Sequence, residues 1–286
     1  MSGYTSAIGD PPAKTCAGAR HQPLGLQQEI AARMPDRGTV LPTGIDVGSA
    51  TDVGRVREAN EDSMLALAAG DGQLLVAVAD GMGGHKAGEV ASELAVTSLR
   101  SSIEQAGRDA DPERVLIDAV EMANIAIWDA AAEDIEKEGM GTTLVAALIT
   151  SSGRIAIANV GDSRAYAVIR GKATLVTTDH TWVNQQVLAK QMSEREARTS
   201  PYRNLLTRAL GSTPRVQVDI IDDVQIGPGD ALVLVSDGVT AYLEERDVAG
   251  ILRASATAQE AAEQLVSEAV DRGGADNATA VVVRRV

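Results

Sequence analysis

Tight turns between strand-length apolar runs restrict the fold of this chain more than any other feature. Apolar runs bounded by turn residues predict strands at 74–79, 143–150, 154–160, 164–170, 173–177, 231–236 and 279–284. Three residues ending in Gly153 separate the second and third runs, and Gly171 and Lys172 alone separate the fourth and fifth. Such short connections force antiparallel neighbours, because a parallel return needs a crossover of about a dozen or more residues. The turn 161–163 is expected to pair the third and fourth strands in the same way.

Helix signals lie apart from these strands. Asp111 followed by Pro112 predicts a cap and a first-turn proline, opening a helix that runs to about residue 136. Thr257 and Glu260 have the spacing of a capping box, and Gly273 supplies the stop. A third helix is predicted at 87–105. Long helices segregated from an antiparallel meander indicate an α+β layered fold, not a doubly wound one.

Composition excludes several classes of protein. Aromatic residues make up 2% of the 286 residues, with no Phe, so the core must be built from Ala, Val, Leu and Ile. A net charge of −14 argues against nucleic-acid binding, which depends on cationic contacts to phosphate. The single cysteine, Cys16, excludes an internal disulfide and fits a reducing compartment. No apolar run approaches the roughly 20 residues of a membrane span, and no signal pattern is evident. A cytoplasmic location is therefore expected.

Two regions differ in character. Residues 1–42 are polar and punctuated by prolines, which predicts a flexible N-terminal extension with at most a short helix at 24–34. From residue 43 to 286 the pattern is dense and continuous, which predicts one folded domain.

Aspartates stand where apolar runs end or begin. Asp80 and Asp237 each follow a predicted strand and precede a glycine, and Asp276 comes shortly before the last strand. Taken singly, each is more often a turn former, since Asp and Gly dominate turns. Taken together, carboxylates at strand ends can converge only if cations lie among them. Oxygen ligands of this kind favour Mg²⁺ or Mn²⁺ over zinc.

Other candidates have open alternatives. Asp162 is as well explained by a hairpin turn as by metal binding. Arg57, four residues before Glu61, could be an ordinary surface arginine or a guanidinium fork for phosphate. His85 and His180 could donate protons, although each is more often a packed or capping residue.

Seven motifs carry a family resemblance. In chain order they are RxxNED (57–62), DGMGGH (80–85), GTT (141–143), VGDSRAY (160–166), TRALG (207–211), SDG (236–238) and DN (276–277). Over 43–286 the chain resembles the metal-dependent protein serine/threonine phosphatases of the PPM, or protein phosphatase 2C, family, in its bacterial form. The resemblance implies a four-layer αββα sandwich, in which helices flank two antiparallel sheets.

The resemblance also implies roles for individual residues. Asp80 would bridge two Mn²⁺ or Mg²⁺ ions, and the carbonyl of Gly81 would bind one of them. The other protein ligands would be Asp237 and Asp276 for the first ion and Glu61, backed by Asp62, for the second.

Arg57 would bind the substrate phosphate. Asp162 would help hold a third ion. The segment at about 181–204 matches the family's flap, and Asn204 in it would face that ion. Eukaryotic members carry His at the position of Met82, where it serves as general acid. Here a metal-bound water is the favoured proton donor, with His85 as the alternative.

The expected reaction is hydrolysis of phosphoserine or phosphothreonine by attack of a metal-bridging hydroxide, with catalysis resting on Arg57 and Asp80. The expected partners are phosphoproteins, including serine/threonine kinases or their targets. Two alternatives keep the fold: a catalytically inactive pseudophosphatase scaffold, and a phosphatase that acts on an anti-sigma-factor antagonist.

Overall fold

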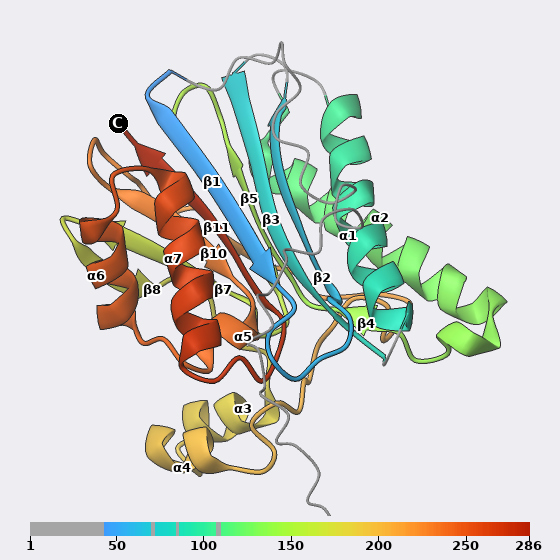
Figure 1. Cartoon of the computed structure of the whole chain (residues 1–286). Helices are drawn as coiled ribbons and strands as arrows, with labels where there is room; N and C mark the ends of the chain where they lie inside the picture. Colours follow the sequence, from blue (N-terminus) through green and yellow to red (C-terminus); the bar gives the residue numbers. More distant parts are fainter. Residues whose placement is uncertain (1–42, 70–71, 84–85, 107–109) are drawn as a thin grey trace, which may run out of the picture.

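Two antiparallel sheets stack face to face in the computed structural model, which describes residues 43–69, 72–83, 86–106 and 110–286 (Figure 1). The first sheet has the strand order β1 (Ile45–Asp52), β11 (Ala278–Arg285), β10 (Ala231–Val235), β7 (Arg164–Ile169), β8 (Lys172–Leu175). The second has the order β2 (Asp62–Ala69), β3 (Gln73–Met82), β5 (Leu144–Ile149), β6 (Ile155–Val160), β9 (Asp219–Ile221), and β4 (Gly141–Thr142) pairs with β3. The predicted extension 1–42, with its helix at 24–34, lies outside the described residues.

Helices cover the outer face of each sheet. On the second sheet lie α1 (Lys86–Gln105) and α2 (Pro112–Glu133), which contact β3 and β6. On the first lie α6 (Glu245–Ala254) and α7 (Ala258–Asp271), which contact β8, β1 and β11. The short elements are η2 (Ile135–Lys137), α3 (Trp182–Leu188), α4 (Glu194–Thr199) and α5 (Asp237–Thr240). The expected four-layer αββα sandwich is confirmed.

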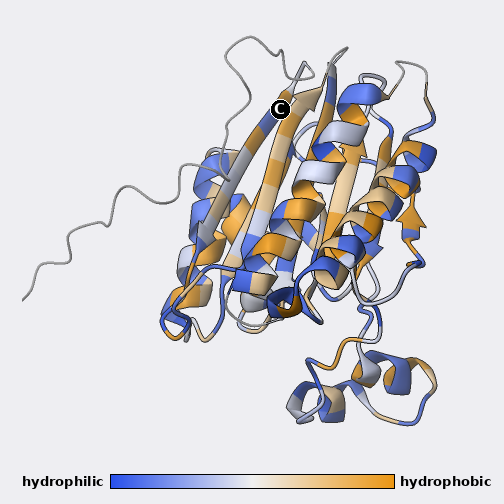
Figure 2. Ribbon diagram, turned by 90° about the vertical axis from the view of Figure 1, so that its right-hand side faces the viewer, coloured by the Kyte–Doolittle hydropathy of each residue, from blue (hydrophilic) through white to orange (hydrophobic). Residues whose placement is uncertain are grey.

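Side chains of β3 alternate between two of the three apolar layers. Leu75, Ala77 and Ala79 point to the layer beneath α1 and α2, and Leu74, Val76 and Val78 point to the layer between the sheets. A strand buried on both faces reads as a continuous apolar run, which is why these strands are visible in the sequence. Figure 2 shows hydrophobic residues concentrated in the strands and alternating with hydrophilic ones along the helices.

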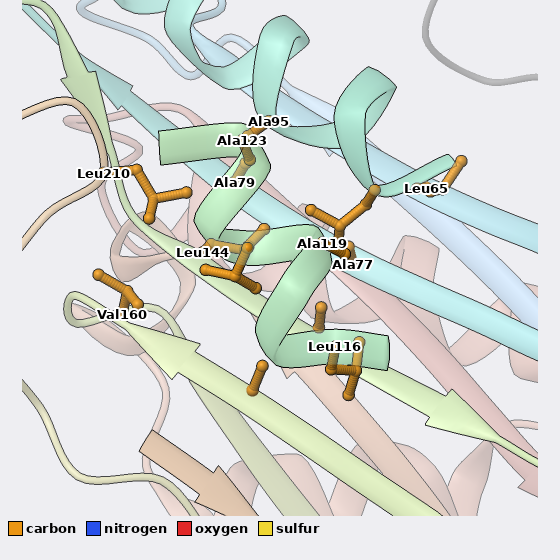
Figure 3. Packing of buried hydrophobic residues seen from close by; sticks show 14 of the residues in the cluster. Leu65, Ala77, Ala79, Ala95, Leu116, Ala119, Ala123, Leu144, Val160 and Leu210 are labelled. Carbon is orange, nitrogen blue, oxygen red and sulfur yellow. The ribbon is translucent and has the colours of Figure 1, made fainter. Parts of the chain in front are cut away.

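Small side chains let the helices lie close to the sheet. Ala95 of α1 and Ala119 and Ala123 of α2 are fully buried near Ala77 and Ala79 of β3 (Figure 3). Alanines at these crossings leave no room for large rings, which accounts for a core built without Phe.

The turn 161–163 corrects one prediction. It does not join a hairpin, because β6 pairs with β5 and β9 while β7 pairs with β10 and β8. The chain passes here from one sheet to the other. A short connection excludes a parallel return but does not require that the two strands pair, and Gly161, at φ +105°, makes the corner. The hairpins β5–β6 and β7–β8 are confirmed.

Both predicted helix caps differ in detail. Asp111 occupies the cap of α2, but its carboxylate makes no capping bond and lies 3.6 Å from Arg154 instead. Thr257 caps α7 by accepting from the N–H of Glu260, at 3.1 Å. The Glu260 carboxylate reaches one residue further back, to the N–H of Ala256, so the capping box is not formed.

The segment 181–204, called the flap below, contains α3 and α4 and lies outside the sandwich (Figure 1). Its two ends meet where Trp182 donates its N–H to the carbonyl of Leu205, at 2.8 Å. Trp182 also packs edge-on against Tyr202, with ring centroids 5.5 Å apart. The flap is thus closed at its base.

Candidate active site

Four strands bring acidic residues to one end of the sandwich. Asp62 opens β2 directly opposite Asp80 on β3, because the two are partners in the antiparallel register. Asp237 follows β10 and Asp276 precedes β11, and these strands are also antiparallel neighbours. The sheet topology therefore collects residues from distant parts of the sequence at a single edge.

Asp80 lies at the centre of this cluster. Its pKa is raised well above the ordinary value, first by burial and then by the negative charges of Asp62, Asp237, Asp162 and Asp276. These charges act on Asp80 because the strand pairing brings their carboxyl groups to the same edge of the sandwich. When no cation is bound, these carboxyl groups can lie so close together only if some of them are protonated.

Asp62 ties the two sheets together. Its Oδ2 accepts hydrogen bonds from Ser236, at 2.9 Å, which directly follows β10, and from Thr279, at 2.6 Å, in β11 of the opposite sheet. Its Oδ1 is buried and has no hydrogen-bond partner. Burial raises the pKa of Asp62 to about 7, although the two hydroxyl groups lower it. An orphaned buried carboxylate oxygen is costly unless a ligand or cation satisfies it.

Three predicted ligands, Asp80, Asp237 and Asp276, interact with other protein groups. The pKa of Asp237 is raised by burial and by the charge of Asp276, while the neighbouring Asp80 carboxyl group lowers it. Arg57 donates to Oδ2 of Asp276 at 2.8 Å. In this arrangement no three acidic, histidine or cysteine side chains of the described ranges form a ready cation site. The donor set nevertheless fits a hard dication, because it consists of oxygens and is short of positive charge.

Asp162 lies in the corner between β6 and β7. Burial raises its pKa to about 7, with further contributions from the charges of Asp237 and Asp179. The Thr143 hydroxyl accepts from the N–H of Asp80, at 3.1 Å, and is hydrogen bonded to Ser163, at 2.7 Å. Asp162 is thus connected to Asp80 through neighbouring residues as well as through charge.

Glycines allow a close approach at Glu61. A side chain at Gly81 would place its Cβ 2.1 Å from the carbonyl oxygen of Gly88, and one at Gly88 would lie 2.8 Å from Oε2 of Glu61. The Glu61 carboxylate therefore lies against the first turn of α1. Glu61 is 8% exposed. The pKa of Arg57 is raised, first by its hydrogen bond to Asp276 and then by the negative charges of Asp276, Glu61 and Asp80.

Asn277 is a residue at the site that the sequence analysis did not single out. Its Oδ1 accepts from the N–H of Glu61, at 2.9 Å. Its Nδ2 donates to the carbonyls of Val53 and Ala59, at 2.9 Å each, on either side of Arg57. The asparagine therefore shapes the loop that carries Arg57. Its only sequence signal is its place beside Asp276.

The proton-donor candidates are placed less directly. Met82 ends β3 at the same edge, and its thioether has no proton to give. His85 lies outside the described residues. Asn204, which is expected to face the third ion and not to donate a proton, is exposed at the end of the flap.

The comparisons with known proteins agree with this geometry. The sequence profile of the family described as Protein phosphatase 2C matches residues 54–272. The serine/threonine phosphatase stp of Listeria monocytogenes is 38% identical over 238 residues, which cover 82% of this chain and 94% of that protein.

Solved structures are similar as well. The S. agalactiae serine/threonine phosphatase superposes with a TM-score of 0.80 at 34% identity, over 85% of this chain and all of that chain. The catalytic domain of the phosphatase PstP, solved with two manganese ions, gives a TM-score of 0.73 at 33% identity, over 84% of this chain and 97% of that one. Together with the two-sheet fold and its acidic edge, these matches show that the chain belongs to the protein phosphatase 2C family.

Proposed function

We propose that this protein hydrolyses phosphoserine and phosphothreonine in phosphoproteins, using two or three Mn²⁺ or Mg²⁺ ions. The observation that carries the proposal is the convergence of Asp62, Asp80, Asp162, Asp237 and Asp276 beside Arg57. Relatives of the chain are named serine/threonine phosphatases, and one related structure holds two manganese ions, which supports both the substrate and the cofactor.

The acidic residues at this edge would bind the metal ions. Asp80, Asp237, Asp276 and the Gly81 carbonyl would hold the central ions, with Glu61 and Asp162 at the periphery. Bound dications would lower the pKa of water and so supply hydroxide at neutral pH for attack on phosphorus.

Arg57 would bind phosphoryl oxygens and offset their charge. Its side chain is 48% exposed, so it can reach a substrate, and Asn277 holds its loop in place. Met82 has no proton to donate, so the leaving alkoxide must take its proton from another group.

Manganese-dependent release of phosphate from a phosphothreonine peptide tests the proposal. We expect turnover that a chelator stops and added Mn²⁺ restores, together with stoichiometric Mn²⁺ binding by calorimetry. A protein that neither binds Mn²⁺ stoichiometrically nor releases phosphate from any phosphopeptide would favour the scaffold alternative. The retained acidic set argues against that alternative, because a scaffold has no need of it.

The partners follow from the chemistry. Phosphoproteins are the substrates, and we propose serine/threonine kinases or their targets among them. The alternative function, dephosphorylation of an anti-sigma-factor antagonist, would use the same site and the same chemistry. It differs only in the protein that is the substrate. A cytoplasmic location is proposed from the single cysteine. No helix in the described ranges is long and apolar enough to cross a membrane.

A further inference from the structure

The corner that carries Asp162 is held on both sides by one short segment. The N–H of Gly161 donates to Nδ1 of His180, at 3.0 Å, and the N–H of His180 donates to the carbonyl of Gly161, at 2.9 Å. On the other side, Arg164 pairs with Asp179 through two hydrogen bonds of 2.9 and 2.6 Å. The backbone on either side of Asp162 is therefore held by Asp179 and His180.

The hydrogen bonds define the state of the His180 ring. A nitrogen that accepts from a backbone N–H carries no proton, so Nδ1 is the bare nitrogen and Nε2 carries the hydrogen of the neutral ring. Nε2 then donates to Oδ2 of Asp219, at 3.0 Å. Arg208 lies 3.0 Å from Nε2 but donates to Oδ1 of the same Asp219, at 2.5 Å. The ring is 6% exposed, so water does not compete for these bonds.

The same histidine sits at the base of the flap. Its carbonyl accepts from the N–H of Thr207, at 2.8 Å, just after the flap returns to the sandwich. The next residue along the chain, Thr181, forms a bridge with Leu206. The ring of His180 thus contacts Gly161, next to Asp162, and its backbone carbonyl contacts Thr207, just after the flap.

We propose that His180 is a positioning residue that fixes Asp162 beside Asp80 and Asp237 and ties that position to the base of the flap. It acts through Nδ1 as the neutral Nε2–H tautomer. The inference rests on the proposed function only where it gives Asp162 a role in binding metal.

Two substitutions of similar size separate the two ring nitrogens. In His180→Asn the side-chain oxygen lies where Nδ1 lies and can still accept from Gly161. In His180→Gln the amide reaches the place of Nε2, so the bond to Asp219 can persist while the bond to Gly161 is lost. Asp230→Asn serves as a control, because Asp230 also anchors two backbone N–H groups, those of Arg170 and Gly227, at the opposite end of β10.

The first measurement needs neither metal nor activity. In the metal-free protein, ¹⁵N spectra should show His180 as the Nε2–H tautomer, and exchange of the Gly161 amide should be slow. His180→Gln should speed that exchange at least fivefold, the factor expected for one lost hydrogen bond, while His180→Asn should leave it within about twofold. An Nδ1–H tautomer, or equal exchange in both variants, overturns the proposal.

The second measurement concerns metal dependence. His180→Gln should raise the Mn²⁺ concentration for half-maximal phosphopeptide turnover about fivefold, with KM for the peptide changed less than twofold. His180→Asn and Asp230→Asn should keep the wild-type value even where thermal stability falls. A rise of the same size in Asp230→Asn would mean that any loss of stability has this effect, and would overturn the positioning role. If no variant shows turnover, the proposed function fails, and the exchange and tautomer results still decide the role of the histidine.

Discussion

Arg57 donates a hydrogen bond from Nη2 to Oδ2 of Asp276, at 2.8 Å, and so joins the expected phosphate ligand to an expected metal ligand. The second oxygen of Asp276 accepts from the N–H of Asn277, at 2.9 Å. Both oxygens of this carboxylate are therefore engaged in the metal-free protein. A dication that binds Asp276 must displace or share the guanidinium, which would release Arg57 toward a substrate.

Removing the guanidinium should accordingly have opposite effects on two ligands. In Arg57→Ala we expect KM for a phosphopeptide to rise at least tenfold, since charge-assisted hydrogen bonds contribute about 1.5–3 kcal/mol. Mn²⁺ binding should become tighter, because Asp276 loses its competitor. Steady-state kinetics and calorimetry measure the two effects. Weaker Mn²⁺ binding in Arg57→Ala, with the fold intact by circular dichroism, would contradict this account.

Neutralising the central carboxylates should cost activity and gain stability. Asp80→Asn and Asp237→Asn are expected to abolish Mn²⁺-dependent turnover. Each should also raise the melting temperature of the metal-free protein at pH 8, because a repulsive negative charge is removed from a crowded site. Thermal scans with chelator, beside phosphatase assays, test both points. Asp118→Asn, on the outer face of α2, is a control that should leave turnover unchanged.

The stability of the metal-free protein should fall as pH rises from about 4 to about 8. Asp62 and Asp162 have pKa values of about 7, and those of Asp80 and Asp237 are also raised, so the folded state binds more protons than the unfolded state in this range. Stability from a raised pKa is complete below the unfolded value, near 4, and is lost as pH passes the folded value. His180 opposes the trend, since its pKa is lowered, chiefly by burial.

Urea denaturation at several pH values measures this slope. Saturating Mn²⁺ should reverse it, because the metal binds the ionised carboxylates and its stabilisation grows as they lose protons. A metal-free protein whose free energy of unfolding rises between pH 5 and 8 would show that the carboxylates are not packed as described.

Gly161→Ala should be among the most disruptive single substitutions. The new Cβ would lie 2.6 Å from Cβ of Thr143, and the backbone there has φ +105°. We expect a loss of about 2–4 kcal/mol in the free energy of unfolding, from overpacking and backbone strain together. Gly229→Ala, at φ +85° with no atom within 4 Å, isolates the strain and should cost about 1 kcal/mol. Equal losses in the two variants would rule out the steric explanation.

The buried strands and long helices could be predicted because their patterns are local. The strands at 74–79 and 279–284 are apolar on both faces, so they stand out without any tertiary information. The sequence does not predict strand β1, because β1 lies at the edge of its sheet and its residues, IDVGSATD, are mostly small or polar. Strand β2 was missed because the run MLALA is equally compatible with a helix, and only its pairing with β3 makes it extended.

The acidic residues that gather at one edge could be named from the sequence, but the contacts among them and their neighbours could not. Motifs identify Asp80 and Asp237, yet no local pattern shows that Asp62 would bond to Ser236 and Thr279 across the sandwich, 174 and 217 residues away in sequence. The pairing of Arg57 with Asp276 depends in the same way on two loops meeting in space. Such contacts follow from topology, which short-range periodicity does not specify.

The closed base of the flap has an evolutionary consequence. Because the chain leaves and re-enters through the adjoining backbones of Trp182 and Leu205, the entropy of closing the intervening loop changes only slowly with its length. Insertions, deletions or wholesale exchange of this stretch would leave the sandwich undisturbed. Related proteins could thus vary the flap, and with it the proteins that they bind, while the sandwich and its acidic residues stay the same.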